Sequence, residues 1–308
     1  MFLENGYAQG RLKGALHVGS RRKEEGMQPV LQLEGAGAER GNAFWLRDVN
    51  LTVEPGTLMG VIGRNGAGKT TLFHMICGLS RISEGEVRVN GVSMKQEPEW
   101  CKGEMGLVFD DDYFRLDLSV KHAGVIYGAY YSKYSQGKFL DLCKEFGVDA
   151  RQNLRKLSRG DYIKFQLAFA LAHCPSLILM DEPEAGLDSI FRREWMDLLY
   201  DVMEGTCSIL FATHLTKELE QRADSVTMLS KGRQIFSNTM LELTEKYKIV
   251  RGSKEQMDGL SKHLIGRRRM EHYEEGLFQG EAQGLWEKVS VSKPALADLI
   301  EYLDGNFE

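Results

Sequence analysis

A glycine-rich loop between an apolar run and a helical pattern constrains the fold of this chain most strongly. Residues 63–70 read Gly-Arg-Asn-Gly-Ala-Gly-Lys-Thr, which fits the pattern GxxxxGK(S/T). The aliphatic run 58–62 precedes the loop and a helical pattern at 69–78 follows it, as the motif requires. Glycines let the backbone curl so that its N–H groups face phosphate oxygens. The chain is therefore predicted to bind a nucleoside triphosphate.

Each part of this phosphate loop has an expected contact. Lys69 is expected to reach the β- and γ-phosphates, and the Thr70 hydroxyl to ligate Mg²⁺. The helix N-terminus adds a favourable dipole. A chance glycine-rich turn is the alternative, and the flanking strand and helix argue against it. The expected nucleotide contacts are Gly63, Arg64, Asn65, Gly66, Ala67, Gly68, Lys69, Thr70 and Thr71.

Short apolar runs alternate with helical patterns between residues 30 and 238, which is typical of an α/β fold. Strands are predicted at 43–53, 58–62, 85–89, 105–109, 176–180, 207–212 and 224–229. Helices are predicted at 69–78, 118–133, 137–146, 160–173, 189–203 and 216–222. Three regions are expected: a flexible extension at 1–26, a nucleotide-binding domain at 27–239, and a small accessory α+β domain at 240–308.

Charge and hydropathy narrow the possible partners. A net charge of −5 argues against a mainly electrostatic nucleic-acid binder. No apolar run reaches the roughly 18 residues that a membrane helix needs, so a role at a membrane is expected to depend on a partner. The basic run 267–269 fits either a solvated face or a contact with a membrane or partner.

An apolar run at 177–180 ends in two carboxylates, Asp181 and Glu182. Such a run suits a central parallel strand, whose carboxyl end lies where open α/β sheets bind ligands. Asp181 is then placed to hold Mg²⁺ and Glu182 to polarise an attacking water. The alternative is that the pair caps the next helix, but the upstream phosphate loop favours catalysis.

These motifs together resemble an ATP-binding cassette (ABC) ATPase. The matching segments are 63–71, 157–160, 181–182, 186–188 and 213–214, within roughly residues 30–238. The resemblance implies a P-loop core with a mixed sheet, flanking helices and a helical subdomain at about 111–160. It also implies that two cassettes face head to tail, with each ATP between one phosphate loop and the partner's Ser-x-Gly signature.

The resemblance assigns further roles. Ser158 and Gly160 would contact the γ-phosphate held by the partner, and Asp188 would couple the two sites. His214 would sense the γ-phosphate and support the transition state, although a lone histidine after a strand is more often structural. Arg40 stands near the position of the aromatic residue that stacks on adenine, and its guanidinium could stack in place of a ring.

Two positions depart from the family pattern. The signature contains Arg159 and Asp161 where the family has glycine and glutamine, but hydrolysis is still expected because Ser158 and Gly160 remain. Asp110 replaces the usual glutamine after strand 105–109. A carboxylate can ligate Mg²⁺ but cannot donate a hydrogen bond to water, so altered coupling is expected. A solvated acidic turn is the alternative.

The predicted helical insert is rich in aromatic residues, of which Tyr113 and Phe114 are the preferred candidates for docking on a permease. Residues 131–160 and the tail 289–303 are similar to ATPase subunits of bacterial exporters whose permease is a separate chain. The expected function is the ATP-hydrolysing subunit of such an exporter, with ATP and Mg²⁺ as cofactors. A soluble cassette acting on nucleic acid or ribosomes is the alternative, although such proteins usually have two cassettes and basic linkers.

The exporter hypothesis specifies partners and location. The expected partners are an integral-membrane permease and a second ABC ATPase subunit, in a homodimer or heterodimer, with no nucleic acid. The expected location is cytoplasmic, on the inner face of the cell membrane through the permease.

Overall fold

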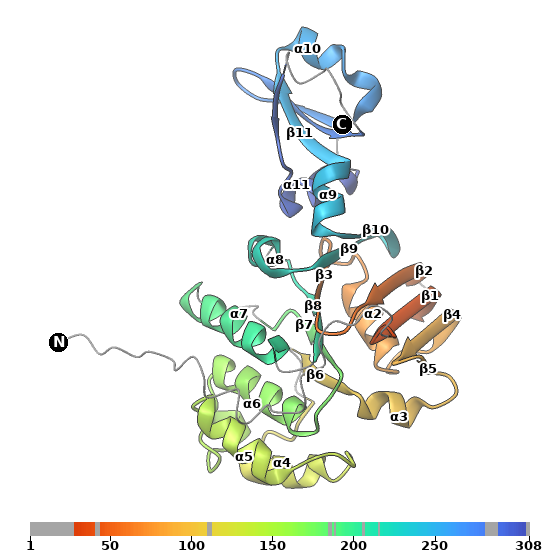
Figure 1. Ribbon diagram of the computed structural model, residues 1–308. Helices are drawn as coiled ribbons and strands as arrows, with labels where there is room; N and C mark the ends of the chain where they lie inside the picture. The colour runs from red at the N-terminus through yellow and green to blue at the C-terminus, as the bar shows by residue number, and fades with distance from the viewer. Residues whose placement is uncertain are drawn as a thin grey trace, which may run out of the picture.

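The computed structural model describes residues 28–40, 44–109, 113–183, 187, 189–204, 207–214, 216–280 and 289–305. Figure 1 shows a large sheet in the middle, a group of helices at one end and a smaller sheet at the other. The α/β fold expected from the sequence is confirmed. None of the helices in these ranges combines the length and apolar character needed to cross a bilayer.

Ten strands form the large sheet within the described residues, in the order β5-β4-β1-β2-β10-β9-β3-β8-β7-β6. Strands β9, β3, β8, β7 and β6 pair in parallel, whereas β5, β4, β1 and β2 are antiparallel. The strands are β1 (Leu31–Arg40), β2 (Phe44–Val53), β3 (Leu58–Ile62), β4 (Ile82–Val89), β5 (Val92–Ser93), β6 (Met105–Phe109), β7 (Leu177–Asp181), β8 (Ser208–Ala212), β9 (Ser225–Ser230) and β10 (Arg233–Thr239).

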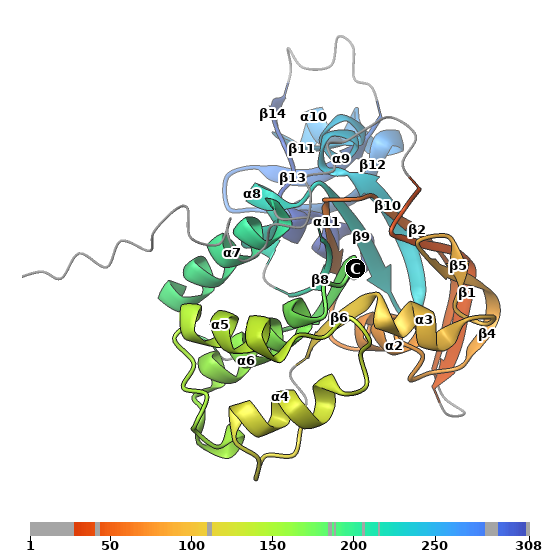
Figure 2. The same ribbon diagram turned by 60° about the horizontal axis from the view of Figure 1, so that its bottom comes forward.

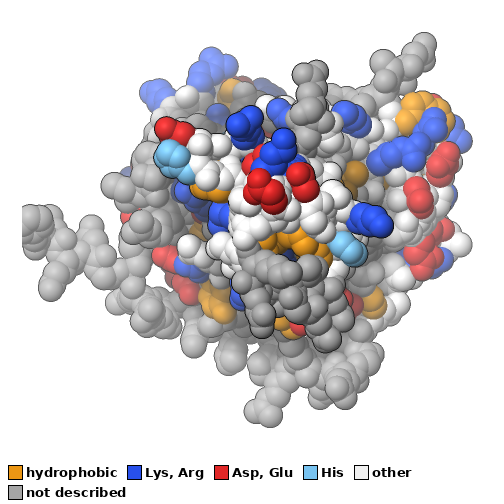
Figure 3. Space-filling model, turned by 90° about the horizontal axis from the view of Figure 1, so that it is seen from above, with side chains coloured by type: hydrophobic (Ala, Val, Ile, Leu, Met, Phe, Trp, Pro, Cys, Tyr) orange, Lys and Arg blue, Asp and Glu red, His pale blue; other side chains and the backbone are white. Residues whose placement is uncertain are grey.

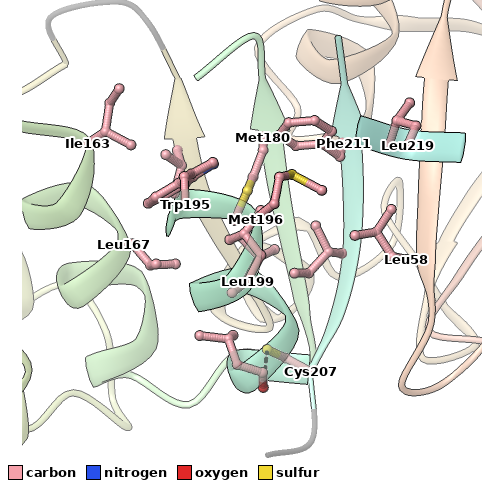
Figure 4. Packing of buried hydrophobic residues seen from close by; sticks show 14 of the residues in the cluster. Leu58, Ile163, Leu167, Met180, Trp195, Met196, Leu199, Cys207, Phe211 and Leu219 are labelled. Carbon is pink, nitrogen blue, oxygen red and sulfur yellow. Dashed lines mark hydrogen bonds between the residues drawn. The ribbon is translucent and has the colours of Figure 1, made fainter. Parts of the chain in front are cut away.

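The parallel strands are apolar because helices cover both of their faces. Every residue of β3 and β8 is buried. Helix α2 (Lys69–Ile76) packs in the same apolar cluster as the antiparallel strands, while α6 (Arg159–Ala172) and α7 (Ser189–Glu204) belong to the other main cluster. Figure 4 shows Trp195 of α7 between α6 and the strands, close to Met180. Two packed layers therefore hold the ends of β3, β7 and β8 in place.

A helical insert follows β6 and contains α4 (Val120–Gly128), α5 (Gln136–Glu145) and α6. A serine side chain caps the N-terminus of each of these helices. The helix predicted at 118–133 is shorter in the structure and ends at Gly128. The ring of Tyr134 packs where a Cβ on Gly128 would lie, 2.2 Å away, so a larger residue does not fit there. The short helix α3 (Pro98–Gly103) precedes β6.

Phe114 is partly buried and packs against the core of this insert. Its ring makes edge contacts with Tyr127, Phe165 and Phe169 at centroid distances of 4.8–5.2 Å. Tyr113 is 45% exposed, with its ring beside Phe109. Of the two docking candidates, only Tyr113 therefore faces outward.

A second sheet, of four strands in the described residues, follows the large one in the order β12-β13-β11-β14. Figure 2 shows it beyond the β9–β10 end of the core. Its elements, with the helices that lead into and pack on it, are α8 (Thr216–Arg222), α9 (Met240–Lys246), β11 (Tyr247–Gly252), α10 (Lys254–Asp258), β12 (Leu264–Arg269), β13 (Glu274–Gln279), β14 (Ser290–Ser292) and α11 (Leu296–Leu303). Helix α11 buries Leu296, Leu299 and Tyr302 against this end of the molecule.

The basic run 267–269 is largely paired within this sheet. Arg267 forms ion pairs with Asp258 and Glu274, and Arg268 binds Glu275 on the neighbouring strand. Figure 3 views this end of the molecule and shows Lys and Arg side chains next to Asp and Glu side chains. Arg267 and Arg268 therefore form ion pairs within the small sheet. Neither the solvated face nor the membrane or partner contact expected from the sequence describes them.

Candidate functional site

The strand register brings three sequence motifs to one edge of the sheet. Ala212 lies opposite Val61 on one side and Asp181 on the other. Strands β3, β7 and β8 therefore end at the same level, and the residues after them meet. The phosphate loop 63–70, the acidic pair at 181–182 and His214 become neighbours for this reason.

The phosphate loop has the curled backbone that its glycines predict. Gly68 has a φ of 116° immediately before α2, and Gly63 has a φ of 151°. A Cβ on Gly63 would lie 2.4 Å from the carbonyl oxygen of Leu229, so no larger residue fits there. Arg64, Asn65 and Gly66 are exposed at the tip, whereas Ala67, Gly68, Lys69 and Thr71 are buried and Thr70 is half-buried.

Lys69 points back across this loop. Its side chain is only 5% exposed, and its Nζ donates a hydrogen bond to the carbonyl oxygen of Gly63 at 2.9 Å. The same Nζ lies 3.1 Å from Oε1 of Glu182. The buried ammonium is thus held between the loop backbone and the acidic strand end, where it can meet phosphate oxygens.

Asp181 lies beside Thr70 at the end of β7. Burial raises the pKa of Asp181, and a hydrogen bond with the Thr70 side chain opposes this rise. Its Oδ1 is buried and has no hydrogen-bond partner among the described residues. A carboxylate and a hydroxyl are hard oxygen donors, so this pair fits Mg²⁺. The described residues contain no group of three or more His, Cys, Asp or Glu placed to bind a metal.

Glu182 leaves the strand in a left-handed conformation, with a φ of 48°. Its backbone N–H donates to the carbonyl oxygen of Ala212 at 2.9 Å, which fixes the turn. Its Oε2 lies 3.4 Å from Nδ1 of His214, on the side opposite Lys69. The Glu182 side chain therefore faces the phosphate loop and His214, which favours catalysis over helix capping.

The signature lies away from this chain's own phosphate loop. Ser158 caps α6, where its Oγ accepts from the Asp161 N–H at 3.1 Å and donates to Asp161 Oδ2 at 2.7 Å. Gly160 is buried in the first turn of α6. Figure 1 shows α6 among the helices of the insert, separated from α2 by the sheet. The structure thus does not bring Ser158 or Gly160 to residues 63–70 of the same chain.

Three predicted site residues fall, wholly or in part, outside the described residues. Asp110 and Asp188 lie outside the described residues, and so does the side chain of Arg40, whose backbone ends β1.

Gln166 is a structural residue that the sequence reasoning missed. It is buried in α6, donates from Nε2 to the Phe109 carbonyl oxygen at 2.9 Å, and accepts from the Phe109 N–H at 3.0 Å. It ties the signature helix to the end of β6. A lone amide within the otherwise apolar run 165–172 was the available signal, because a buried amide needs partners.

Comparison with known proteins identifies the family. The family described as ABC transporter matches residues 46–185. The ABC transporter ATP-binding protein NatA of Bacillus subtilis is 33% identical over 207 residues, which is 65% of this chain and 84% of that protein. The chain belongs to the ABC transporter ATPase family. This ABC protein is therefore an ATP-binding, ATP-hydrolysing subunit of a transporter complex, and the resemblance drawn from its motifs is confirmed.

Another ATP-binding protein and two solved structures of ABC transporter proteins are also similar to this chain. The Nod factor export ATP-binding protein I of Rhizobium leguminosarum bv. viciae is 28% identical over 226 residues, covering 71% of this ABC protein and 73% of the relative. A solved ATP-binding subunit of an ABC transporter superposes with a TM-score of 0.63 at 23% identity, over 70% of this chain and 91% of that one. The structure of cbiO1 from Clostridium perfringens, part of the complex cbiONQ, gives 0.61 at 24% identity, over 70% and 90%. These two structures support the fold alone.

Proposed function

We propose that this cassette powers an exporter whose permease is a separate membrane chain. The observation that carries the catalytic part is the position of Glu182, whose carboxylate lies between Lys69 at 3.1 Å and His214 at 3.4 Å. The name of the Nod factor relative supports the direction of transport for that protein, and we extend it to this chain.

In the proposed reaction, the water oxygen attacks the γ-phosphorus of ATP while Glu182 takes a proton from that water and later passes it to the departing phosphate. The bond from that phosphorus to the bridging oxygen then breaks, and ADP and phosphate leave. Lys69 and His214 would face the phosphate oxygens of bound ATP, which carry negative charge. Preorganised hydrogen-bond donors stabilise such charge, so Lys69 and His214, which flank Glu182, are suited to this step.

Mg²⁺ fits the site next to this carboxylate. Thr70 and Asp181 would hold the ion, and the free, buried Oδ1 of Asp181 supports that assignment. When bound, Mg²⁺ neutralises charge on the β- and γ-phosphate oxygens. Asp110 stays a predicted further ligand, and Arg40 a predicted partner of the adenine.

We propose that two such chains, identical or related, sandwich ATP head to tail. The location of Ser158 and Gly160 in the insert, away from their own phosphate loop, supports a contact with the partner's nucleotide. Asp188 would lie at the same interface. Size-exclusion chromatography with light scattering tests this: Glu182→Gln with ATP should run as a dimer, and a persistent monomer would contradict the head-to-tail arrangement.

The permease would dock on the helical insert. On α4, Val125 and Ile126 are 52% and 46% exposed, and Tyr130 just beyond it is 84% exposed. Together with Tyr113 these side chains offer apolar area that a partner can cover. Docking there would hold the protein at the inner face of the cell membrane.

Purification from membranes tests the transporter assignment. A tagged chain should bring down one multi-span membrane protein, and replacing Ile126 and Tyr130 by Asp should release it while ATP binding persists. A matched pair of exposed apolar residues elsewhere in the molecule, Leu79 and Leu241, serves as control. Recovery with RNA and without a membrane protein would contradict the proposal.

The direction of transport needs a separate test. Cells carrying Glu182→Gln should retain some compound that wild-type cells release to the medium, as seen by comparing metabolites inside and outside the cells. A compound that instead disappears from the cells and persists in the medium would identify an importer.

A further inference from the structure

Helix α11 connects the small sheet to two sides of the nucleotide site. At its start, the backbone N–H of Leu296 donates to Oε1 of Glu220 on α8, the helix that follows His214, at 2.7 Å. At its end, Asp304 reaches Ser230 and Arg64. Helix α11 is thus attached both to α8 and to the end of β9 and the phosphate loop.

Asp304 is placed for these contacts by the way α11 ends. Gly305 has a φ of 75°, so the helix stops and leaves Asp304 as its C-cap. The Asp304 side chain is only 9% exposed. Its Oδ1 accepts a hydrogen bond from the Ser230 hydroxyl, and its Oδ2 lies 3.6 Å from Nε of Arg64. A cation at a helix C-terminus is also favoured by the helix dipole.

Both partners of Asp304 belong to the phosphate loop or to its support. Arg64 is the second residue of the loop. Ser230 starts the turn that backs it, because the Gly232 N–H donates to the Ala67 carbonyl oxygen at 2.9 Å. The carbonyl oxygen of Leu229, the residue before Ser230 in β9, leaves no space for a side chain at Gly63. One carboxylate therefore joins the loop to the structure behind it.

We propose that Asp304 is a positioning residue that holds the phosphate loop in the shape that receives ATP. It acts through Arg64 and Ser230 and does not touch the nucleotide. A loop held in its binding conformation loses less entropy when the ligand arrives, so it binds more tightly. The small C-terminal sheet, through α11, thereby sets the ATP affinity of the cassette. The inference rests on ATP binding at residues 63–70.

An electrostatic effect and a positioning effect of Asp304 predict opposite changes in ATP affinity when Asp304 is replaced. A negative charge near the loop repels triphosphate, so its removal alone would tighten binding. Loss of positioning would weaken binding. The direction of the change in affinity therefore separates the two effects.

The test measures ATP affinity of the full-length protein by titration, and KM and kcat of the permease complex. Asp304→Ala should raise the ATP Kd and KM about three- to tenfold and leave kcat at saturating ATP unchanged, as expected for one charge-assisted contact. Asp304→Asn should have a smaller effect, because the amide still accepts from Ser230. Glu301→Gln is the matched control, since it removes a charge from the same helix and its partner is Arg268.

A double-mutant cycle and a second variant complete the test. Arg64→Gln and Asp304→Ala should be less than additive in the ATP Kd, because they break the same contact. Ser230→Ala should weaken ATP binding without any change of charge, even if Asp304→Ala folds poorly. Unchanged affinity, tighter binding or additive effects would overturn the inference. Failure of the wild-type protein to bind ATP would instead count against the nucleotide site itself.

Discussion

The Nζ of Lys69 lies 3.1 Å from Oε1 of Glu182, and Oε2 of the same carboxylate lies 3.4 Å from Nδ1 of His214. One side chain thus touches the phosphate loop and the end of β8 at the same time. The arrangement depends on the left-handed φ of 48° at Glu182, which turns the side chain out of the strand direction. The neighbouring Asp181 keeps its strand conformation and faces Thr70 instead.

Replacing Glu182 by Gln should leave ATP binding near the wild-type level and reduce turnover at least about 100-fold, because an amide cannot take a proton from water. Steady-state phosphate release and nucleotide titration measure the two quantities. Glu99→Gln, on an exposed glutamate of α3, is the control and should behave as wild type. Turnover close to wild type in Glu182→Gln would show that another group activates the water.

Lys69→Ala should weaken ATP binding by about tenfold or more, the effect of losing a charge-assisted contact of about 1.5–3 kcal/mol. The change also leaves Glu182 without its closest cation, which adds repulsion of the phosphates. Titration with ATP checks the prediction, with Lys102→Ala as an exposed control. An unchanged affinity would remove Lys69 from the phosphate site.

Asp181→Asn should stabilise the protein without ligands at pH 7. Burial raises the pKa of Asp181 despite the hydrogen bond with Thr70, so the folded protein holds the ionised carboxyl at a cost. The stability associated with this group is greatest when it is protonated and is lost as pH rises through the folded-state pKa. We expect the variant to unfold about 2–4 °C higher, as about 1 kcal/mol would produce.

Thermal unfolding followed by circular dichroism measures this difference, which should shrink toward acid pH, where the carboxyl is protonated in both states. Addition of ATP and Mg²⁺ should reverse the order, because only the wild type offers an anionic ligand. A variant that is less stable than wild type at pH 7 would mean that the carboxylate has a compensating partner.

Glu275→Gln should destabilise the small sheet by about 2 kcal/mol at pH 7, the scale of a charge-assisted hydrogen bond. Burial raises the pKa of Glu275, but hydrogen bonds from Arg268 and Arg251 outweigh it, so the net pKa is lowered. The ion pairs therefore add stability above the unfolded-state pKa, and this is lost as pH falls through the lower, folded-state pKa.

Urea unfolding of the wild type and the variant at several pH values checks this prediction. The difference in the free energy of unfolding between wild type and variant should be largest at neutral pH and disappear in acid. Glu271→Gln, at an exposed glutamate in the turn before β13, should have no effect at either pH. Equal stability of Glu275→Gln and wild type at pH 7 would mean that the cluster adds nothing to folding.

Local patterns predicted the centre of the fold and the motifs of the site. The run 58–62 became β3, and the loop after it has the backbone that its glycines require. The parallel run 177–180 placed Asp181 and Glu182 at the correct edge because buried strands must end where the sheet ends. In each case the chemistry and the conformation are encoded within a few neighbouring residues.

Contacts between segments that are distant in the sequence could not be predicted from local patterns. Arg267 and Arg268 looked like a free basic run because their partners are defined only when β12 pairs with β13. Likewise, nothing local in Asp304 points to Arg64, since the contact depends on how α11 packs. Phe114 looked like a docking residue for the same reason, because the rings that enclose it come from α4 and α6.

The two hydrogen bonds between Gln166 and the backbone of Phe109 have a mechanical consequence. Both polar groups of the last residue of β6 are held by one side chain of α6. The helix therefore cannot shift along the strand without breaking two buried bonds at once. A force applied at Ser158, the N-cap of that helix, acts on the strand that precedes residues 110–112.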